Sequence, residues 1–211
     1  QNFYNDDENS FTYLSMTGIE KEYYGIEAGL DFKVASFLNF KAIGTISDAK
    51  NINNANVNYM LSKSAEVVKD YAYIKDMRES GTPLTIGSLA LDFHKSGWFV
   101  NLNANWYDRI YLSYSPSYRY KSSLKNRDML FNDEPLPGSV DQAKGHGGWM
   151  VDGSIGKSIR LKHGSLNFNL MITNILNNRK IVSGGYEQSR SDYTLNKENE
   201  AKDRVYKFSK N

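Results

Sequence analysis

Three segments of the chain place an apolar side chain at every second position, and this period of two constrains the fold more than any other feature. In Tyr24–Val34, every second residue is apolar and the residues between are glycine or charged. Trp98–Trp106 places asparagine at most of its polar positions, and Leu166–Thr173 interleaves apolar residues with asparagine, methionine and threonine. A period of two predicts a β-strand with one apolar and one polar face. Strands of about ten residues with this pattern are typical of transmembrane β-barrels.

Short connections join the expected strands into three hairpins, whereas long polar segments separate the hairpins. Short turns at one end and long loops at the other are typical of outer-membrane barrels, with the turns periplasmic and the loops extracellular. A soluble β-sandwich would have comparable loops at both ends. We therefore expect Lys95 on the periplasmic side and Ser123 outside the cell. The hairpins pair Tyr24–Val34 with Leu38–Ile46, Gly87–Phe93 with Trp98–Trp106, and Val151–Leu161 with Leu166–Ile172, and the long segments are 47–84, 107–149 and the residues after Asn174.

Aromatic residues gather at the ends of the expected strands, where the interfacial girdles of a membrane barrel would lie. The alternative is the ordinary enrichment of aromatic residues in strands. The residues concerned are Tyr23, Tyr24, Trp98, Phe99, Trp106, Tyr107 and Trp149.

The two faces of the strands predict two environments. The polar face is too hydrophilic for a packed core, so we expect it to line water or to contact a polar plug. Six clear strands cannot close a wide barrel, and an open edge in lipid leaves backbone groups unsatisfied. Further strands must therefore come from elsewhere. We expect Ile26, Leu30, Leu102, Phe168 and Leu170 to face lipid, and Glu27, Asp31, Asn103 and Asn169 to face the lumen.

Composition excludes several classes of protein. The 211 residues carry a net charge of +2 with no lysine or arginine run longer than a pair, so no nucleic-acid partner is expected. The absence of cysteine fits passage through an oxidising compartment. No window approaches 18 consecutive apolar residues, so no transmembrane helix is expected, and barrel strands would not produce one.

The first residues lack both the basic and the apolar region of an export signal. An outer-membrane protein needs an export signal. We therefore expect the sequence to be a mature form or, as the favoured interpretation, a piece of a longer protein.

Motifs that could carry chemistry give no catalytic, cofactor or metal residue. Gly153–Ser158 ends in Gly-Lys-Ser, but a phosphate-binding loop needs its first glycine at Val151 and a helix afterwards. His94 and His163 are expected in two short turns and His146 at the opposite end, so they cannot converge on a metal. An enzyme is a weak hypothesis, resting on a histidine near Asp152. The acidic run at residues 6–8 is expected to be solvated rather than to bind calcium.

The segment from Tyr107 to Tyr120 holds five tyrosines together with Arg109, Arg119 and Pro116. Tyrosine and arginine form large, rigid contacts with ligands and partners. The segment could equally extend two strands above the membrane, and the sequence leaves both interpretations open.

Several stretches resemble one known family. Gly81–Thr85 followed by a strand, then Trp98–Leu112, resembles the late barrel strands of TonB-dependent outer-membrane receptors of the Bacteroidetes type. Asn169–Asn178 running into Gly184–Arg190 is similar to the same family, as is Gly25-Ile26-Glu27 before an alternating strand. The resemblance spans roughly Gly18 to Phe208.

The resemblance implies an all-β, antiparallel transmembrane barrel of about 22 strands filled by a plug. Residues 1–211 would supply six or seven strands from its C-terminal part, without the plug, the TonB box or the last strand, which Arg204–Asn211 only approaches. The implied function is import of a scarce nutrient across the bacterial outer membrane with energy from TonB. The implied partners are outer-membrane lipid, the remainder of the barrel and its plug, TonB, and a surface lipoprotein. The resemblance assigns no ligand-binding residue, because receptors of this family bind different ligands through variable loops. The runner-up is a structural or partner-binding barrel without transport.

Overall fold

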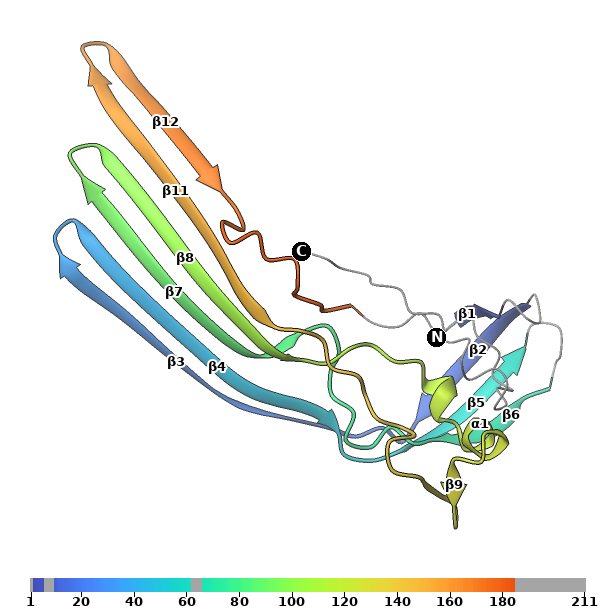
Figure 1. The fold of residues 1–211 in the computed structure, drawn as a ribbon. Helices are drawn as coiled ribbons and strands as arrows, with labels where there is room; N and C mark the ends of the chain where they lie inside the picture. The colour runs from blue at the N-terminus through green and yellow to red at the C-terminus, as the bar shows by residue number, and fades with distance from the viewer. Residues whose placement is uncertain (1, 6–9, 62–65, 185–211) are drawn as a thin grey trace.

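The computed structural model describes residues 2–5, 10–61 and 66–184. The fold is all-β with antiparallel pairing, and it consists of one long sheet and a smaller region at one end of that sheet (Figure 1). The long sheet has six strands in the order β12-β11-β8-β7-β4-β3. Their bounds are β3 Lys21–Ala35, β4 Leu38–Asn51, β7 Pro83–Lys95, β8 Trp98–Ile110, β11 Gly148–Leu161 and β12 Gly164–Ile172.

The three expected hairpins are confirmed, and their strands are longer than the alternation alone indicated. Each hairpin turns through two residues, which are 36–37, 96–97 and 162–163. In the second turn Ser96 and Gly97 both have positive φ, 51° and 79°, as a tight type I′-like hairpin requires. His94 therefore lies within β7 rather than in the turn where the sequence placed it.

The long segments between the hairpins are not simple loops. Together with the N-terminal residues they fold into a region that we call the cap. Its sheet has the order β1-β2-β5-β6, and two short helices and a two-stranded ribbon complete it. The bounds are β1 Asn2–Asn5, β2 Ser10–Thr17, β5 Ala55–Leu61, β6 Val68–Ala72, the 3₁₀ helix η1 Pro116–Arg119, α1 Lys121–Asn126, β9 Leu130–Phe131 and β10 Glu134–Pro135.

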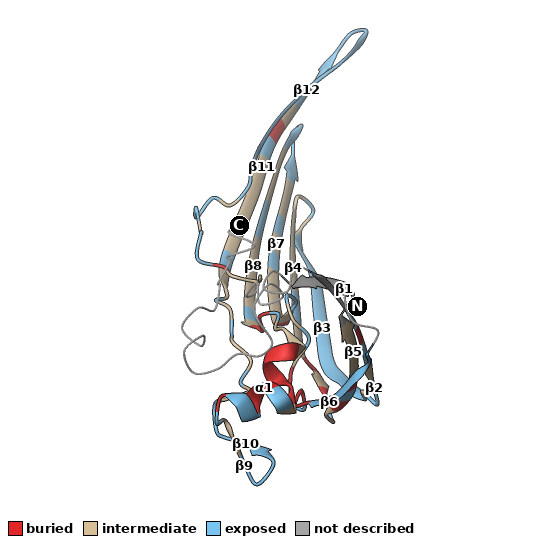
Figure 2. Ribbon diagram, turned by 90° about the vertical axis from the view of Figure 1, so that its right-hand side faces the viewer, coloured by how far each residue is buried: buried red, intermediate tan, exposed pale blue. Residues whose placement is uncertain are grey.

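The principal hydrophobic core lies in the cap and not beneath the long sheet. In β5, Ala55 and Val57 alternate with asparagines, and both are buried against Ile74 and Tyr120. Leu124 of α1 is also fully buried. Figure 2 shows buried residues concentrated around α1, while most of the long strands are exposed or intermediate. The cap thus folds by ordinary apolar burial.

The long sheet does not close on itself within the described residues. β3 pairs only with β4, and β12 pairs only with β11, so each leaves one edge free. Every residue of β12 is exposed, as are all residues of β3 except the last. The sheet is compatible with a segment of a larger barrel.

Candidate functional site: a sheet with an apolar and a polar face

The strand register brings the apolar residues of all six strands onto one face. Residues directly opposite one another in antiparallel strands share a face. One row across the sheet runs from Leu170 through Ile155, Val100 and Phe93 to Leu38. We call this side the apolar face. Parallel rows add Ile26, Leu30, Phe32, Phe40, Ala42, Ile46, Leu89, Leu91, Leu102, Ala104, Val151, Ile159, Leu166, Phe168 and Ile172.

The apolar face is open rather than packed. Ile26 is 78% exposed, Leu170 59% and Leu102 42%. Contiguous exposed apolar surface on this scale marks contact with a membrane or with another protein. The sequence therefore assigned these residues correctly to two opposite faces of the sheet.

Aromatic residues lie at the two ends of the apolar face, but not all of those expected there. Trp106 and Trp149 are paired at the cap end, and Trp98 lies at the turn end. Tyr23 and Phe99 were expected in the same girdles, but the register places them on the opposite face. Tyr107 also faces that side, opposite Gly148. The error arises because neighbours along a strand point to opposite sides.

The other side, which we call the polar face, carries a set of side-chain interactions across the strands. Asn39 donates a hydrogen bond of 2.8 Å to Asp31, and the Ser88 hydroxyl donates one of 2.8 Å to Asn105. The same face also carries apolar residues, among them Ile43, Ile86, Phe99 and Met171. Inter-strand polar contacts of this kind stabilise a sheet that faces water.

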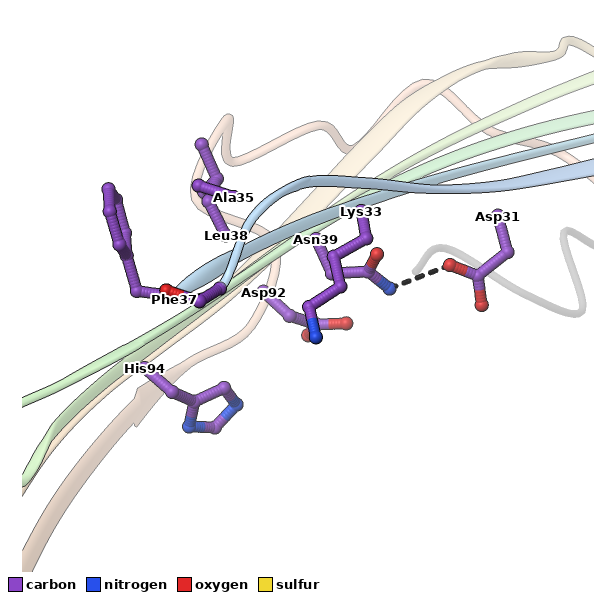
Figure 3. A pocket seen from close by; sticks show the side chains of 9 residues that line it. Asp31, Lys33, Ala35, Phe37, Leu38, Asn39, Asp92 and His94 are labelled. Carbon is purple, nitrogen blue, oxygen red and sulfur yellow. Dashed lines mark hydrogen bonds between the residues drawn. The ribbon is translucent and has the colours of Figure 1, made fainter.

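A pocket of about 390 Å³ lies on the polar face at the turn end of β3, β4 and β7. Figure 3 shows Lys33, Asn39, Asp92 and His94 on one side of the ribbon, with Ala35 and Leu38 on the other. The carboxylate of Asp92 also lies 3.7 Å from the ammonium of Lys41. The pocket therefore presents charges of both signs.

Glycine allows a close approach between strands on the polar face. A Cβ added to Gly156 would lie 2.0 Å from the Phe99 ring and 2.5 Å from the carbonyl oxygen of Phe168. The Phe99 ring thus covers the backbone of the neighbouring strand, a position that only glycine accommodates.

A partly buried ion pair joins the long sheet to the cap. Arg78 donates hydrogen bonds of 2.8 and 3.1 Å to the two carboxylate oxygens of Asp48, and Arg109 lies 3.5 Å away from the same carboxylate. Burial alone would raise the pKa of Asp48, but the hydrogen bonds and charge of Arg78 hold it below its ordinary value. Arg109 also donates to the carbonyl oxygen of Ser47. This cluster fixes where the cap meets β4 and β8.

The tyrosine- and arginine-rich segment belongs mostly to the interior of the cap. Residues 107–110 do extend β8, as one interpretation expected, but beyond Ile110 the chain leaves the sheet. Tyr111 is buried between Arg78 and Lys144, whose cations lie 4.9 and 5.6 Å from its ring centre. Tyr120 is 2% exposed and stacks on Tyr59. These rings are structural contacts and are not available as a binding surface.

The cap has a pocket of its own, again of about 390 Å³. Tyr71 and Tyr73 line it with Lys121 and Asp133, and the two rings meet edge to face at 5.2 Å. The Tyr73 hydroxyl donates a hydrogen bond of 2.5 Å to the carbonyl oxygen of Asp133, and Lys121 lies 2.8 Å from the carboxylate of Asp133. No sequence motif indicated this pocket, because its lining comes from segments about 60 residues apart.

The motifs that sequence reasoning set aside lie in separate elements. Gly153–Ser158 lies within β11, with no helix after it. His94 is on β7, His163 is in a turn, and His146 is near the cap. Asp152 accepts a hydrogen bond from the backbone of Asn174. Within the described ranges, no three His, Cys, Asp or Glu side chains form a group able to hold a metal.

Residues 6–8, 185–190 and 204–211, which carried the acidic run and two parts of the family resemblance, lie outside the described residues. In the part of the chain that is described, no helix has the length and apolar character needed to cross a membrane.

Comparisons of the chain with protein-family models, with curated proteins and with solved structures find no match.

Proposed function

We propose that the long sheet is part of the wall of an outer-membrane β-barrel, and that this barrel is an active transporter importing a scarce nutrient with energy supplied by TonB. The observation that carries the proposal is the exposed apolar face, which continues across six hydrogen-bonded strands opposite a polar face. A soluble protein would have to cover this surface, whereas a bilayer covers it on one side only.

The stagger of the hairpins supports a tilted barrel wall. Leu38 begins β4 and pairs with Phe93, two residues before β7 ends at Lys95. Trp98 begins β8 and pairs with Lys157, four residues before β11 ends at Leu161. If all turns lie at one membrane level, neighbouring hairpins are shifted along the strands by about three residues on average, or roughly 10 Å. Two strands also span roughly 10 Å across the sheet, so this shift corresponds to a tilt of about 45°. Strands in membrane barrels tilt by about 35–45°.

Tryptophan bounds the apolar band of β8 at both ends. The face of β8 between Trp98 and Trp106 spans eight residue steps, which is roughly 26 Å along the strand and, at a tilt of about 45°, roughly 19 Å along the membrane normal. Tryptophan at both ends of such a band suits the two levels of lipid headgroups. The polar face with its charged pocket would then face the lumen, where a plug or a substrate can contact it.

The membrane part of the proposal can be tested on two neighbouring residues of β8. Leu102 lies on the apolar face and Asn103 on the polar face, and both are exposed. Nitroxide labels on Leu102→Cys and Asn103→Cys would be placed in the full-length protein in bilayers. We expect the label at 102 to collide mainly with oxygen, which is enriched in lipid, and the label at 103 with a water-soluble nickel chelate. Equal access of both labels to the chelate would contradict a membrane wall.

The transport part needs a separate test. A TonB-dependent transporter must bind the periplasmic domain of TonB, so the purified full-length protein should retain that domain in a pull-down. A barrel that passes the spin-label test but never binds TonB would be the structural or partner-binding barrel instead.

A further inference from the structure

Two lysines lie on the apolar face at its turn end, where every neighbour on that face is apolar or aromatic. One row across the sheet consists of Lys95 on β7, Trp98 on β8, Lys157 on β11 and Phe168 on β12. An ammonium group on an apolar surface is costly in lipid unless it reaches a polar layer. These positions therefore need a specific explanation.

Both lysines are held at the level of the turns. The Lys157 ammonium donates a hydrogen bond of 2.7 Å to the carbonyl oxygen of Ser96 in the β7–β8 turn, and it lies 4.9 Å from the centre of the Trp98 ring. The Lys95 ammonium lies 4.7 Å from the centre of the Phe37 ring, in the β3–β4 turn. The two strands that carry them flank β8, so their backbones are roughly 10 Å apart.

The two ends of the apolar face differ in charge. On this face, no described residue at the turn end is acidic, since Asp31 and Asp92 lie on the polar face. At the cap end the same face continues into Glu22, Lys50, Asp48 and Asp108, and Asp48 is paired with arginines. The turn end therefore favours an anion more than the cap end, where charges of both signs lie.

We propose that Lys95 and Lys157 form a binding site for the phosphate of an anionic glycerophospholipid headgroup, with Trp98 between them. This site rests on the proposed membrane location. Lys157 uses one of its three N–H groups on Ser96 and has two left for phosphate oxygens. The amphipathic ring of Trp98 contacts the lipid headgroup, and the adjoining apolar face contacts the acyl chains.

Native mass spectrometry of the full-length protein tests the site. The protein in detergent would receive equal amounts of phosphatidylglycerol and phosphatidylcholine. We expect it to retain phosphatidylglycerol preferentially. The double variant Lys95→Gln/Lys157→Gln should lower this preference about 30-fold, since each of the two basic residues near an anionic surface contributes roughly 1 kcal/mol.

Matched variants separate the site from general effects of charge and of folding. Lys33→Gln/Lys41→Gln removes the same charge from the polar face and should keep the lipid preference. Lys95→Arg/Lys157→Arg keeps the charge and should restore it. Retained preference in the double glutamine variant, or displacement of the lipid by inorganic phosphate, would overturn the proposal. A label at Leu102 that lies in water would instead overturn the proposed function itself.

Discussion

Trp106 on β8 and Trp149 on β11 lie directly opposite each other on the apolar face, with their ring centroids 6.5 Å apart. They come from hairpins that are separated by 37 residues of cap, 111–147, so their pairing depends on the register of the whole sheet. With Trp98 at the other end of β8, they place all three tryptophans of the chain on one face. This arrangement is what an interfacial girdle requires.

The sidedness of the sheet can be tested by labelling, with a position that the structure corrects. Ser123, which the sequence placed in an exposed loop, is 1% exposed in α1 and would react poorly as a cysteine. Lys125 on the same helix is exposed and replaces it. In intact cells we expect an impermeant maleimide to label Lys125→Cys and to leave Lys95→Cys unlabelled. The reverse pattern would invert the orientation.

The ion pair between Asp48 and Arg78 should contribute to the stability of the cap. Asp48→Asn leaves the Arg78 guanidinium with a weaker partner, so we expect a loss of about 1–3 kcal/mol in the free energy of unfolding. Asp108→Asn, at an exposed position on the same face, is the control and should change it by less than about 0.5 kcal/mol. Denaturant unfolding of the full-length protein, with proteolysis of the cap as the readout, measures the change in free energy for both variants. Equal losses would contradict a specific role for the pair.

The same pair gives the cap a defined pH dependence. The pKa of Asp48 is lowered in the folded protein, so its stabilisation is complete above the unfolded pKa of about 3.9 and is lost as the pH falls through the lower folded value. The stability difference between the wild type and Asp48→Asn should therefore stay constant from neutral pH to about pH 5 and shrink below about pH 4. A difference that grows on acidification would contradict this assignment.

The alternation of side chains was enough to predict the long sheet, and the reason is physical. A slip of one residue in the register would move Leu170, Ile155 or Val100 to the other side of the sheet, so the apolar face excludes such slips. Two-residue turns then fix the hairpins. The predicted ends were too short because residues such as Lys21 and Ile110 continue the ladder after the alternation is lost.

The cap could not be predicted in the same way. Tyr120 packs on Tyr59, and Asp48 pairs with Arg78, through contacts between segments that are distant in sequence. A tyrosine that contacts a ligand and one that packs in a core give the same local pattern, so residues 107–120 left both interpretations open. The period of two in Ala55–Tyr59 was present but short, and it was hidden among asparagines.

Glycine at position 156 should be required for the contact between β11 and the Phe99 ring. Gly156→Ala places a Cβ against both that ring and the backbone of Phe168, and we expect a loss of about 1–3 kcal/mol from overpacking. Gly29→Ala is the matched control on the same face, because its Cβ would meet nothing closer than 3.9 Å. Heat-modifiable mobility of the folded protein on gels measures both. A fully folded Gly156→Ala with a normal midpoint would contradict the close approach.

The most direct test of the account compares two adjacent residues on β12. Leu170 lies on the apolar face and Asn169 on the polar face, and both are exposed. In water, arginine at either position would cost little. In a bilayer, Leu170→Arg should cost about 2–4 kcal/mol near the midplane and Asn169→Arg much less. We therefore expect the amount of folded full-length protein in the outer membrane to fall sharply for Leu170→Arg and to stay near the wild-type level for Asn169→Arg. Equal amounts of the two variants would contradict the assignment of the apolar face to lipid.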